Sequence, residues 1–171
     1  MIKHPLKILF MHGLDSSRES TKFHAIESTN KFCITIDYRN LSYNTVADFY
    51  QNTIETIQPD LLIGHNLGGY WALKLSSQYH LAAIVANPSL APLFRDDYPS
   101  LTSKELDTDS PKIAYIELGD ESLNMYDIQN VLEDYMIVDS IEGGHHRLEN
   151  PSKLNILIDH IQSEYFSHTI R

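Results

Sequence analysis

Short apolar runs alternate with longer amphipathic stretches along most of this sequence, and no other feature constrains the fold as strongly. Runs such as residues 8–11 and 61–63 are apolar throughout, which is typical of strands covered on both faces in a parallel sheet. Six strands are predicted in this way, over residues 7–12, 32–38, 60–65, 82–87, 112–118 and 135–140.

Helices are predicted between these strands, over residues 45–57, 67–78, 126–132 and 151–166. The last of them has Asn150 as a suitable N-cap and Pro151 at its first position. Because strands and helices alternate, we expect one α/β domain over residues 1–171 with right-handed crossovers. The expected architecture is a six-stranded, mostly parallel sheet flanked by helices, in the strand order 2-1-3-4-5-6.

One segment, residues 88–111, interrupts the alternation. It holds four of the seven prolines and has no long apolar periodicity, and it is long for a plain connection. Ligands bind at the C-terminal edge of such sheets, so we expect a partly helical excursion over that edge. A small lid and an irregular surface connection both fit this segment.

The composition argues against several classes of partner. The chain carries 23 acidic and 13 basic residues, for a net charge of -10, so nucleic acid or an acidic membrane surface would be repelled. Its apolar runs fall short of the roughly 20 residues of a membrane span, and the one near the N-terminus is too short for a signal peptide. The single cysteine, Cys33, lies in an apolar run and is expected to be buried. We therefore expect a cytoplasmic protein.

The third predicted strand runs directly into Gly64-His65-Asn66-Leu67-Gly68. This spacing matches the nucleophile elbow G-x-S-x-G, which joins a strand to a helix through a turn too tight for larger side chains at the glycines. Such a turn places its central residue at the helix N-terminus, where the following backbone N–H helps to stabilise an oxyanion. The sequence fits neither a P-loop nor a dinucleotide-binding motif. Only the central residue departs from the elbow pattern, because Asn66 stands where serine is expected.

The first predicted strand ends in His12-Gly13-Leu14, which suits the second half of an oxyanion hole. Gly13 permits the bend, the Leu14 N–H can point into the site, and the Leu67 N–H would be the other donor. Glycine after a strand is also ordinary turn chemistry.

Two further strand ends carry the remaining candidate residues. Asp120 follows the fifth predicted strand, and His145 and His146 follow the sixth. In hydrolases whose nucleophile stands on such an elbow, the catalytic residues follow the chain order nucleophile, acid, histidine. Position 66, Asp120 and either histidine reproduce this order. The acid would hold the imidazole in the correct tautomer. No spacing typical of a metal site stands out, so no metal is expected.

Taken together, these segments resemble the small bacterial YqiA-type esterases and their YcfP-type relatives, of the α/β-hydrolase superfamily. The resemblance runs through nearly the whole chain, and its motifs are residues 12–17, the elbow with its continuation 68–72, and residues 85–88, 119–121 and 142–146. It implies that His146 rather than His145 is the base, because the family spacing is Gly-Gly-x-His, and that Asp120 is the acid. It also implies hydrolysis of short-chain carboxylic esters without a cofactor.

Asn66 is the departure from this resemblance. The YqiA-type pattern has serine there, whereas YcfP-type relatives can have a non-nucleophilic residue. A carboxamide cannot do the acyl-transfer work of serine, so this chain is expected to be nearly inactive. Asn tolerates the positive φ of an elbow unusually well, and its amide could hydrogen-bond to His146. The fold and pocket should therefore survive.

Three origins of Asn66 fit: a substitution introduced to inactivate the enzyme, natural loss in a pseudo-enzyme, and deamidation to a carboxylate nucleophile. Ser16 or Ser17 could stand in as nucleophile only from outside the elbow. The prediction is an esterase-type hydrolase impaired at position 66; the alternative is a non-catalytic protein that binds a ligand or partner. The ligand would be a small ester or acyl compound, and the expected substrate-binding residues are Gly13, Tyr70 and Trp71. The apolar lining of the pocket is expected to come from Tyr70, Trp71, Leu90, Leu93 and Phe94.

Overall fold

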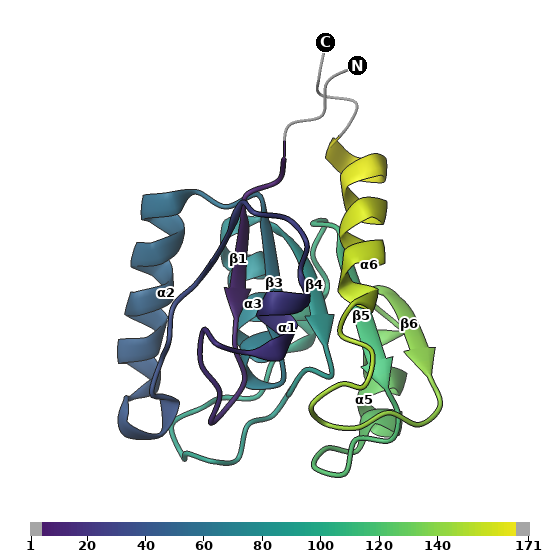
Figure 1. Ribbon diagram of the computed structural model, residues 1–171. Coiled ribbons are helices and arrows are strands. Elements are labelled where there is room, and N and C mark those ends of the chain that lie inside the picture. The colour runs from purple at the N-terminus through teal and green to yellow at the C-terminus, as the bar shows by residue number, and fades with distance from the viewer. Residues whose placement is uncertain (1–4, 167–171) are drawn as a thin grey trace.

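The computed structural model describes residues 5–166 and consists of a six-stranded sheet with helices on both faces (Figure 1). The strands are β1 (Ile8–Met11), β2 (Lys31–Cys33), β3 (Leu61–His65), β4 (Ala82–Ala86), β5 (Lys112–Glu117) and β6 (Ile137–Ile141). They lie in the order β2-β1-β3-β4-β5-β6, and all neighbouring pairs are parallel. The predicted fold class and strand order are confirmed.

Helices cover the sheet in two layers. They are α1 (Thr21–Ala25), α2 (Tyr43–Ile57), α3 (Leu67–Tyr79), α4 (Ser103–Leu106), α5 (Met125–Leu132) and α6 (Lys153–Ile161), with short helical turns at Tyr38–Asn40 and Gln162–Phe166. One apolar core lies between the sheet and helices α2, α3 and α5, and a second lies between the sheet and α6. Strands β1, β3, β4 and β5 are buried throughout, as expected for strands covered on both faces.

Several predicted boundaries are wrong, each for a local reason. β2 ends at Cys33 rather than residue 38, because the backbone leaves the sheet and the Ile36 N–H donates to His12 instead. α6 begins at Lys153 with Ser152 at its N-cap position, so Asn150 and Pro151 form the turn before it. β6 begins two residues late, and α1 was not predicted.

Cys33 is only partly buried, at the end of β2. Burial nevertheless raises the pKa of its thiol to about 12, so the thiolate, the reactive form, is scarce at neutral pH. Cys33 is therefore no candidate nucleophile.

The segment 88–111 is irregular apart from α4 and is attached to helix α3. The Tyr70 hydroxyl donates to the Pro99 carbonyl at 2.7 Å, and Lys74 pairs with Glu105 at 2.6 Å. Tyr98 is buried against Trp71. Opening and closing of this segment as a lid stays a prediction. None of the helices in residues 5–166 is long and apolar enough to cross a membrane.

Candidate active site

The turn between β3 and α3 is an elbow with Asn66 at its apex, where φ is 55° and ψ is -119°. Side chains at Gly64 and Gly68 are excluded, since a Cβ on Gly64 would overlap the Gly68 carbonyl and one on Gly68 would overlap the Met11 carbonyl. The strained backbone of Asn66 is the conformation predicted from the motif, and such strain clusters at functional sites.

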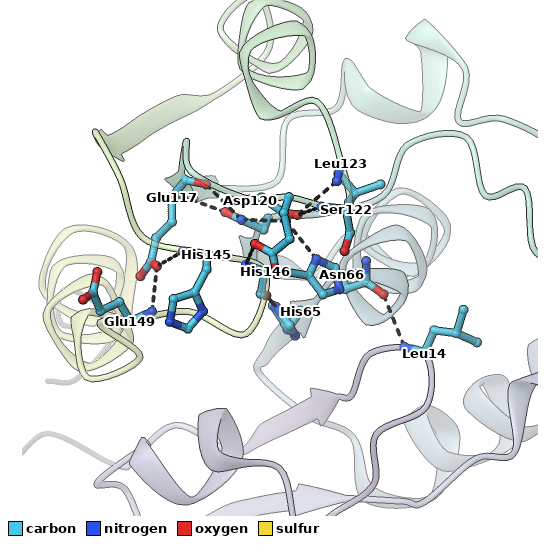
Figure 2. A network of polar contacts seen from close by, with 12 residues as sticks. Leu14, His65, Asn66, Glu117, Asp120, Ser122, Leu123, His145, His146 and Glu149 are labelled. Atoms are coloured by element: carbon cyan, nitrogen blue, oxygen red, sulfur yellow. Dashed lines mark hydrogen bonds and ion pairs between the residues drawn. The ribbon is translucent and has the colours of Figure 1, made fainter.

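Backbone hydrogen bonds fix Asn66 in this position. Its N–H donates to the Ala86 carbonyl at 3.1 Å, and its carbonyl accepts from the N–H groups of Gly69 and Ser89, both at 3.0 Å. The side chain is buried, and its Oδ1 accepts from the Leu14 N–H at 3.3 Å (Figure 2). The sequence allowed a bond from this amide to His146; the amide oxygen instead faces the loop after β1, on the oxyanion-hole side.

The loop after β1 lies against the elbow, as the two halves of an oxyanion hole require. A Cβ on Gly13 would lie 3.2 Å from the Asn66 Cβ, so glycine is needed for this approach. His12 secures the loop: its Nε2 accepts from the Ile36 N–H at 2.8 Å, and its Nδ1 donates to the Gly13 carbonyl at 2.7 Å. Gly13, Leu14 and Leu67 all line the same cavity as Asn66.

Asp120 and His146 meet across the ends of β5 and β6. The Nδ1 of His146 lies 2.9 Å from Oδ2 of Asp120. A neutral imidazole carries a proton on only one of its two nitrogens. If Nδ1 carries that proton and donates it to the Asp120 carboxylate, Nε2 is left as a hydrogen-bond acceptor. His146 lines the cavity that Asn66 lines, and the pair therefore has the arrangement of an orienting acid and a general base.

Asp120 is held as a carboxylate by four hydrogen bonds. Burial raises its pKa, but hydrogen bonds from His146, from the backbone N–H groups of Ser122 and Leu123, and from Asn87 more than offset this and lower the pKa below its usual value. The two N–H donors lie at 2.7 and 3.0 Å from Oδ1, and the Asn87 amide lies 3.0 Å from Oδ2. Asp120 is therefore ionised at neutral pH and cannot turn away from His146.

Two residues that we did not single out position this pair. Asn87 donates to Asp120 and to the Glu117 carbonyl, and it accepts from the Glu117 N–H at 2.7 Å. It thereby joins the end of β4 to the end of β5. Asn87 lies within the motif 85–88 of the family resemblance, but no sequence pattern indicates which side chain it holds.

Glu117 is fully buried and fixes the loop that carries His146 (Figure 2). Its carboxylate accepts from the N–H groups of His145, Glu149 and Asn150 at 3.2, 2.7 and 2.9 Å, and from the Tyr115 hydroxyl at 2.8 Å. A lone acid within the otherwise apolar run 113–118 was the available signal, since a buried carboxylate must be hydrogen-bonded.

His65, the elbow residue before Asn66, connects the elbow to the loop that carries His146. It is buried, and its Nε2–H donates to the His146 carbonyl at 2.7 Å. Burial, together with the charge of Lys22, lowers the pKa of His65 to about 3. The imidazole is therefore neutral at physiological pH and acts as a fixed donor beneath His146.

A cavity of about 630 Å³ opens over the elbow, a volume typical of small-molecule sites. Gly13, which was expected to bind substrate, lines the cavity, and so do Leu93 and Phe94 of the expected apolar lining. Ser16, which is not on the elbow, lines it as well. The expectation for Tyr70, Trp71 and Leu90 is wrong. Tyr70 and Trp71 are buried in the core between α3, α2 and the segment 88–111, where their rings pack against Tyr50 and Tyr98.

Lys22 and Arg147 line this cavity as well and were not predicted. Lys22 lies on α1, a helix too short to give a periodic signal, so no pattern in the sequence marked it. Within residues 5–166, no three His, Cys, Asp or Glu side chains gather closely enough to hold a metal ion.

Comparison with known proteins places this geometry in context. The family model described as "Uncharacterised protein family (UPF0227)" matches residues 7–162. No curated protein matches the chain. A solved structure of an alpha/beta-superfamily protein from Xanthomonas campestris pv. campestris has a TM-score of 0.72 at 16% identity, covering 93% of this chain and 98% of that one.

Two esterase structures are similar over comparable lengths. Est1E from Butyrivibrio proteoclasticus, solved with ferulic acid, has a TM-score of 0.72 at 13% identity and covers 95% of this chain and 89% of that one. The esterase domain of a Rhodothermus marinus protein has a TM-score of 0.68 at 13% identity and covers 94% and 88%. At these identities the likeness establishes the α/β-hydrolase fold.

Proposed function

The chain belongs to the uncharacterised protein family UPF0227, which comprises the YqiA- and YcfP-type proteins. On that premise we propose that it is an esterase-type hydrolase that lacks its nucleophile, because Asn66 stands at the nucleophile position. The observation that carries the proposal is the Asp120–His146 pair at 2.9 Å, directed to the same cavity as the elbow residue. The proposed ligand is a small ester or acyl compound, and no cofactor is needed.

With serine at position 66, each remaining group has a defined task. Nε2 of His146 would take the hydroxyl proton while the oxygen attacks the ester carbonyl, and Asp120 would stabilise the imidazolium. The Leu14 and Leu67 N–H groups would bind the tetrahedral oxyanion. His146 would return the proton to the leaving alcohol, and water would repeat the sequence on the acyl intermediate.

Asn66 stops this sequence at its first step. A carboxamide supplies no nucleophilic oxygen, and loss of a triad nucleophile typically costs on the order of a millionfold in turnover. Moreover, Asn66 Oδ1 already accepts the Leu14 N–H, so one oxyanion donor is engaged before any ligand binds. The chain as it stands would therefore bind esters and hydrolyse them very slowly.

Restoring the nucleophile tests the proposal. Hydrolysis of p-nitrophenyl acetate and butyrate by Asn66→Ser should exceed that of the unaltered chain by at least about a thousandfold. The double variant Asn66→Ser/His146→Ala should lose that gain. The intact mass of the unaltered chain checks that its Asn66 has not been deamidated. A folded Asn66→Ser variant that is silent on both esters would contradict the proposal.

A binding function is the second candidate, and the contact between Asn66 and Leu14 favours it, because an occupied oxyanion donor suits a resting pocket better than a catalytic one. A binding protein has no need of the acid–base pair. Replacing His146 or Asp120 should then leave ligand affinity unchanged.

A further inference from the structure

The cavity holds two cations, Lys22 and Arg147, that no acid neutralises. Lys22 is only 7% exposed, whereas Arg147 is exposed beside His146. Within residues 5–166, neither side chain makes an ion pair or a hydrogen bond. The cavity-lining carboxylate, Asp15, is already engaged by Arg39 through two hydrogen bonds of 2.6 and 2.7 Å.

A second buried lysine shows how unusual Lys22 is. Lys112 is 6% exposed, and its ammonium group donates to the Thr108 carbonyl, the Thr108 hydroxyl and the Ser110 carbonyl at 2.6 to 3.1 Å. Lys22 has the same burial without these acceptors. A buried charge is costly unless it is paired and hydrogen-bonded, so Lys112 has the arrangement of a structural lysine and Lys22 does not.

The electrostatics of the cavity agree with this contrast. Burial lowers the pKa of Lys22, and the neighbouring charge of Arg147 lowers it further. Both groups therefore repel each other across the cavity, in a chain whose net charge is -10. An anion placed between them would offset the desolvation of the ammonium and relieve the repulsion.

We propose that Lys22 and Arg147 form an anion subsite in the active-site cavity, and that the natural ligand is an ester or acyl compound carrying a carboxylate or phosphate group. The inference rests on the proposed function for the ester part of the ligand only. Arginine suits planar carboxylate or phosphate recognition, and lysine supplies a point charge. The cavity volume of about 630 Å³ accommodates both the ester and the anionic group.

Binding to the unaltered chain tests this without requiring turnover. Two matched pairs of probes separate the sources of the anion: monomethyl glutarate against dimethyl glutarate for a carboxylate, and monobutyryl glycerol 3-phosphate against monobutyryl glycerol for a phosphate. For at least one pair, titration should give binding of the charged member at least about tenfold tighter than that of the neutral one, and the preference should shrink as NaCl is raised.

Three variants identify the groups responsible. Lys22→Met keeps the side-chain length without the charge, Arg147→Gln changes an exposed residue, and together they should reduce the charged-to-neutral preference to about one. Lys104→Met is the matched control, because Lys104 on α4 is exposed and lies outside the cavity, and it should keep the preference. Equal binding of the charged and neutral members in both probe pairs would overturn the inference. So would a preference for the charged member that survives in Lys22→Met/Arg147→Gln.

The outcome is separable from that of the ester test. If Asn66→Ser is silent on esters but the unaltered chain prefers anionic probes, the anion subsite stands and the hydrolase proposal fails. If Asn66→Ser hydrolyses esters while binding shows no preference, the hydrolase proposal stands and the subsite is refuted.

Discussion

The elbow between β3 and α3 and the loop between β6 and α6 both present residues to the same cavity, but different forces hold them. The elbow is fixed by its backbone, through close packing at Gly64 and Gly68 and through backbone hydrogen bonds at Asn66. The loop is fixed by polar contacts, through the carboxylates of Glu117 and Asp120.

Under the proposed function, this difference explains how the elbow could lose its nucleophile while the loop kept the acid–base pair. Packing at the elbow depends on Gly64 and Gly68, not on what residue 66 carries, so Asn66 keeps the apex at φ 55°. In the loop, the position of His146 and its role as a base both depend on the carboxylates of Glu117 and Asp120. Substitutions there should therefore disturb both together.

The elbow should be broken most severely by Gly68→Ala. The added Cβ would overlap the backbone carbonyls of Met11 and His12, and backbone of a central strand cannot move aside. We expect a loss of at least about 4 kcal/mol of unfolding free energy, or no folding. Urea denaturation measures it.

Gly143→Ala is the matched control in the loop. Gly143 has φ of +77°, and a Cβ added there would meet nothing within 4 Å, so only backbone strain of about 1 kcal/mol is expected. Equal losses for the two variants would refute the view that close packing fixes the elbow.

Glu117→Gln should have the next largest effect and should act on the loop. The amide keeps the volume but offers one acceptor oxygen to four donors, so we expect a loss of about 3 kcal/mol. Hydrogen exchange at the amides of His145, Glu149 and Asn150 should accelerate, while amides of the elbow should not. The exposed Glu149→Gln is the control, and acceleration in the elbow instead would show that the two regions are not independent.

Lowering the pH should test the role of His65, which belongs to the elbow and donates a hydrogen bond to the loop. Its folded-state pKa of about 3 is below the ordinary value of 6.5, so as pH falls through 6.5 the unfolded chain takes up a proton and the folded chain does not. Stability is therefore lost at about 1 kcal/mol per pH unit.

The variant His65→Gln should flatten this dependence between pH 6 and 5, measured by urea unfolding at each pH. The remaining slope belongs partly to His12, whose pKa burial also lowers. An unchanged slope in His65→Gln would mean that His65 is not neutral in the folded chain.

Asn66→Ser should have the smallest effect on stability. Serine gives up the tolerance of asparagine for positive φ and the 3.3 Å bond to Leu14, for a loss of about 1 kcal/mol or less. Thermal unfolding measures it. A loss comparable to that of Gly68→Ala would show that the elbow does depend on residue 66.

Much of the fold and the chain order of the candidate site could be predicted from the sequence, because both depend on local patterns. Apolar runs specified the strands, and the glycine spacing at 64 and 68 specified the elbow with its positive φ. Predicted boundaries were wrong where a residue distant in sequence determined them. For example, the Ile36 N–H donates to His12 rather than to a neighbouring strand, and β2 ends at Cys33.

The supporting residues could not be predicted in the same way. Glu117, Asn87 and Lys22 owe their roles to contacts between segments far apart in the chain. Tyr70 and Trp71 were misplaced because proximity to the elbow in sequence says nothing about which side of α3 faces the cavity.

The most direct test of the central claim is covalent labelling of Asn66→Ser by a fluorophosphonate, followed by intact mass and peptide mapping. The reagent reports an activated nucleophile whatever the natural substrate is. Our account predicts one label per chain at position 66, and none on the unaltered chain or on Asn66→Ser/His146→Ala. A folded Asn66→Ser variant that takes no label, or takes it elsewhere, would contradict the claim that only the nucleophile is missing.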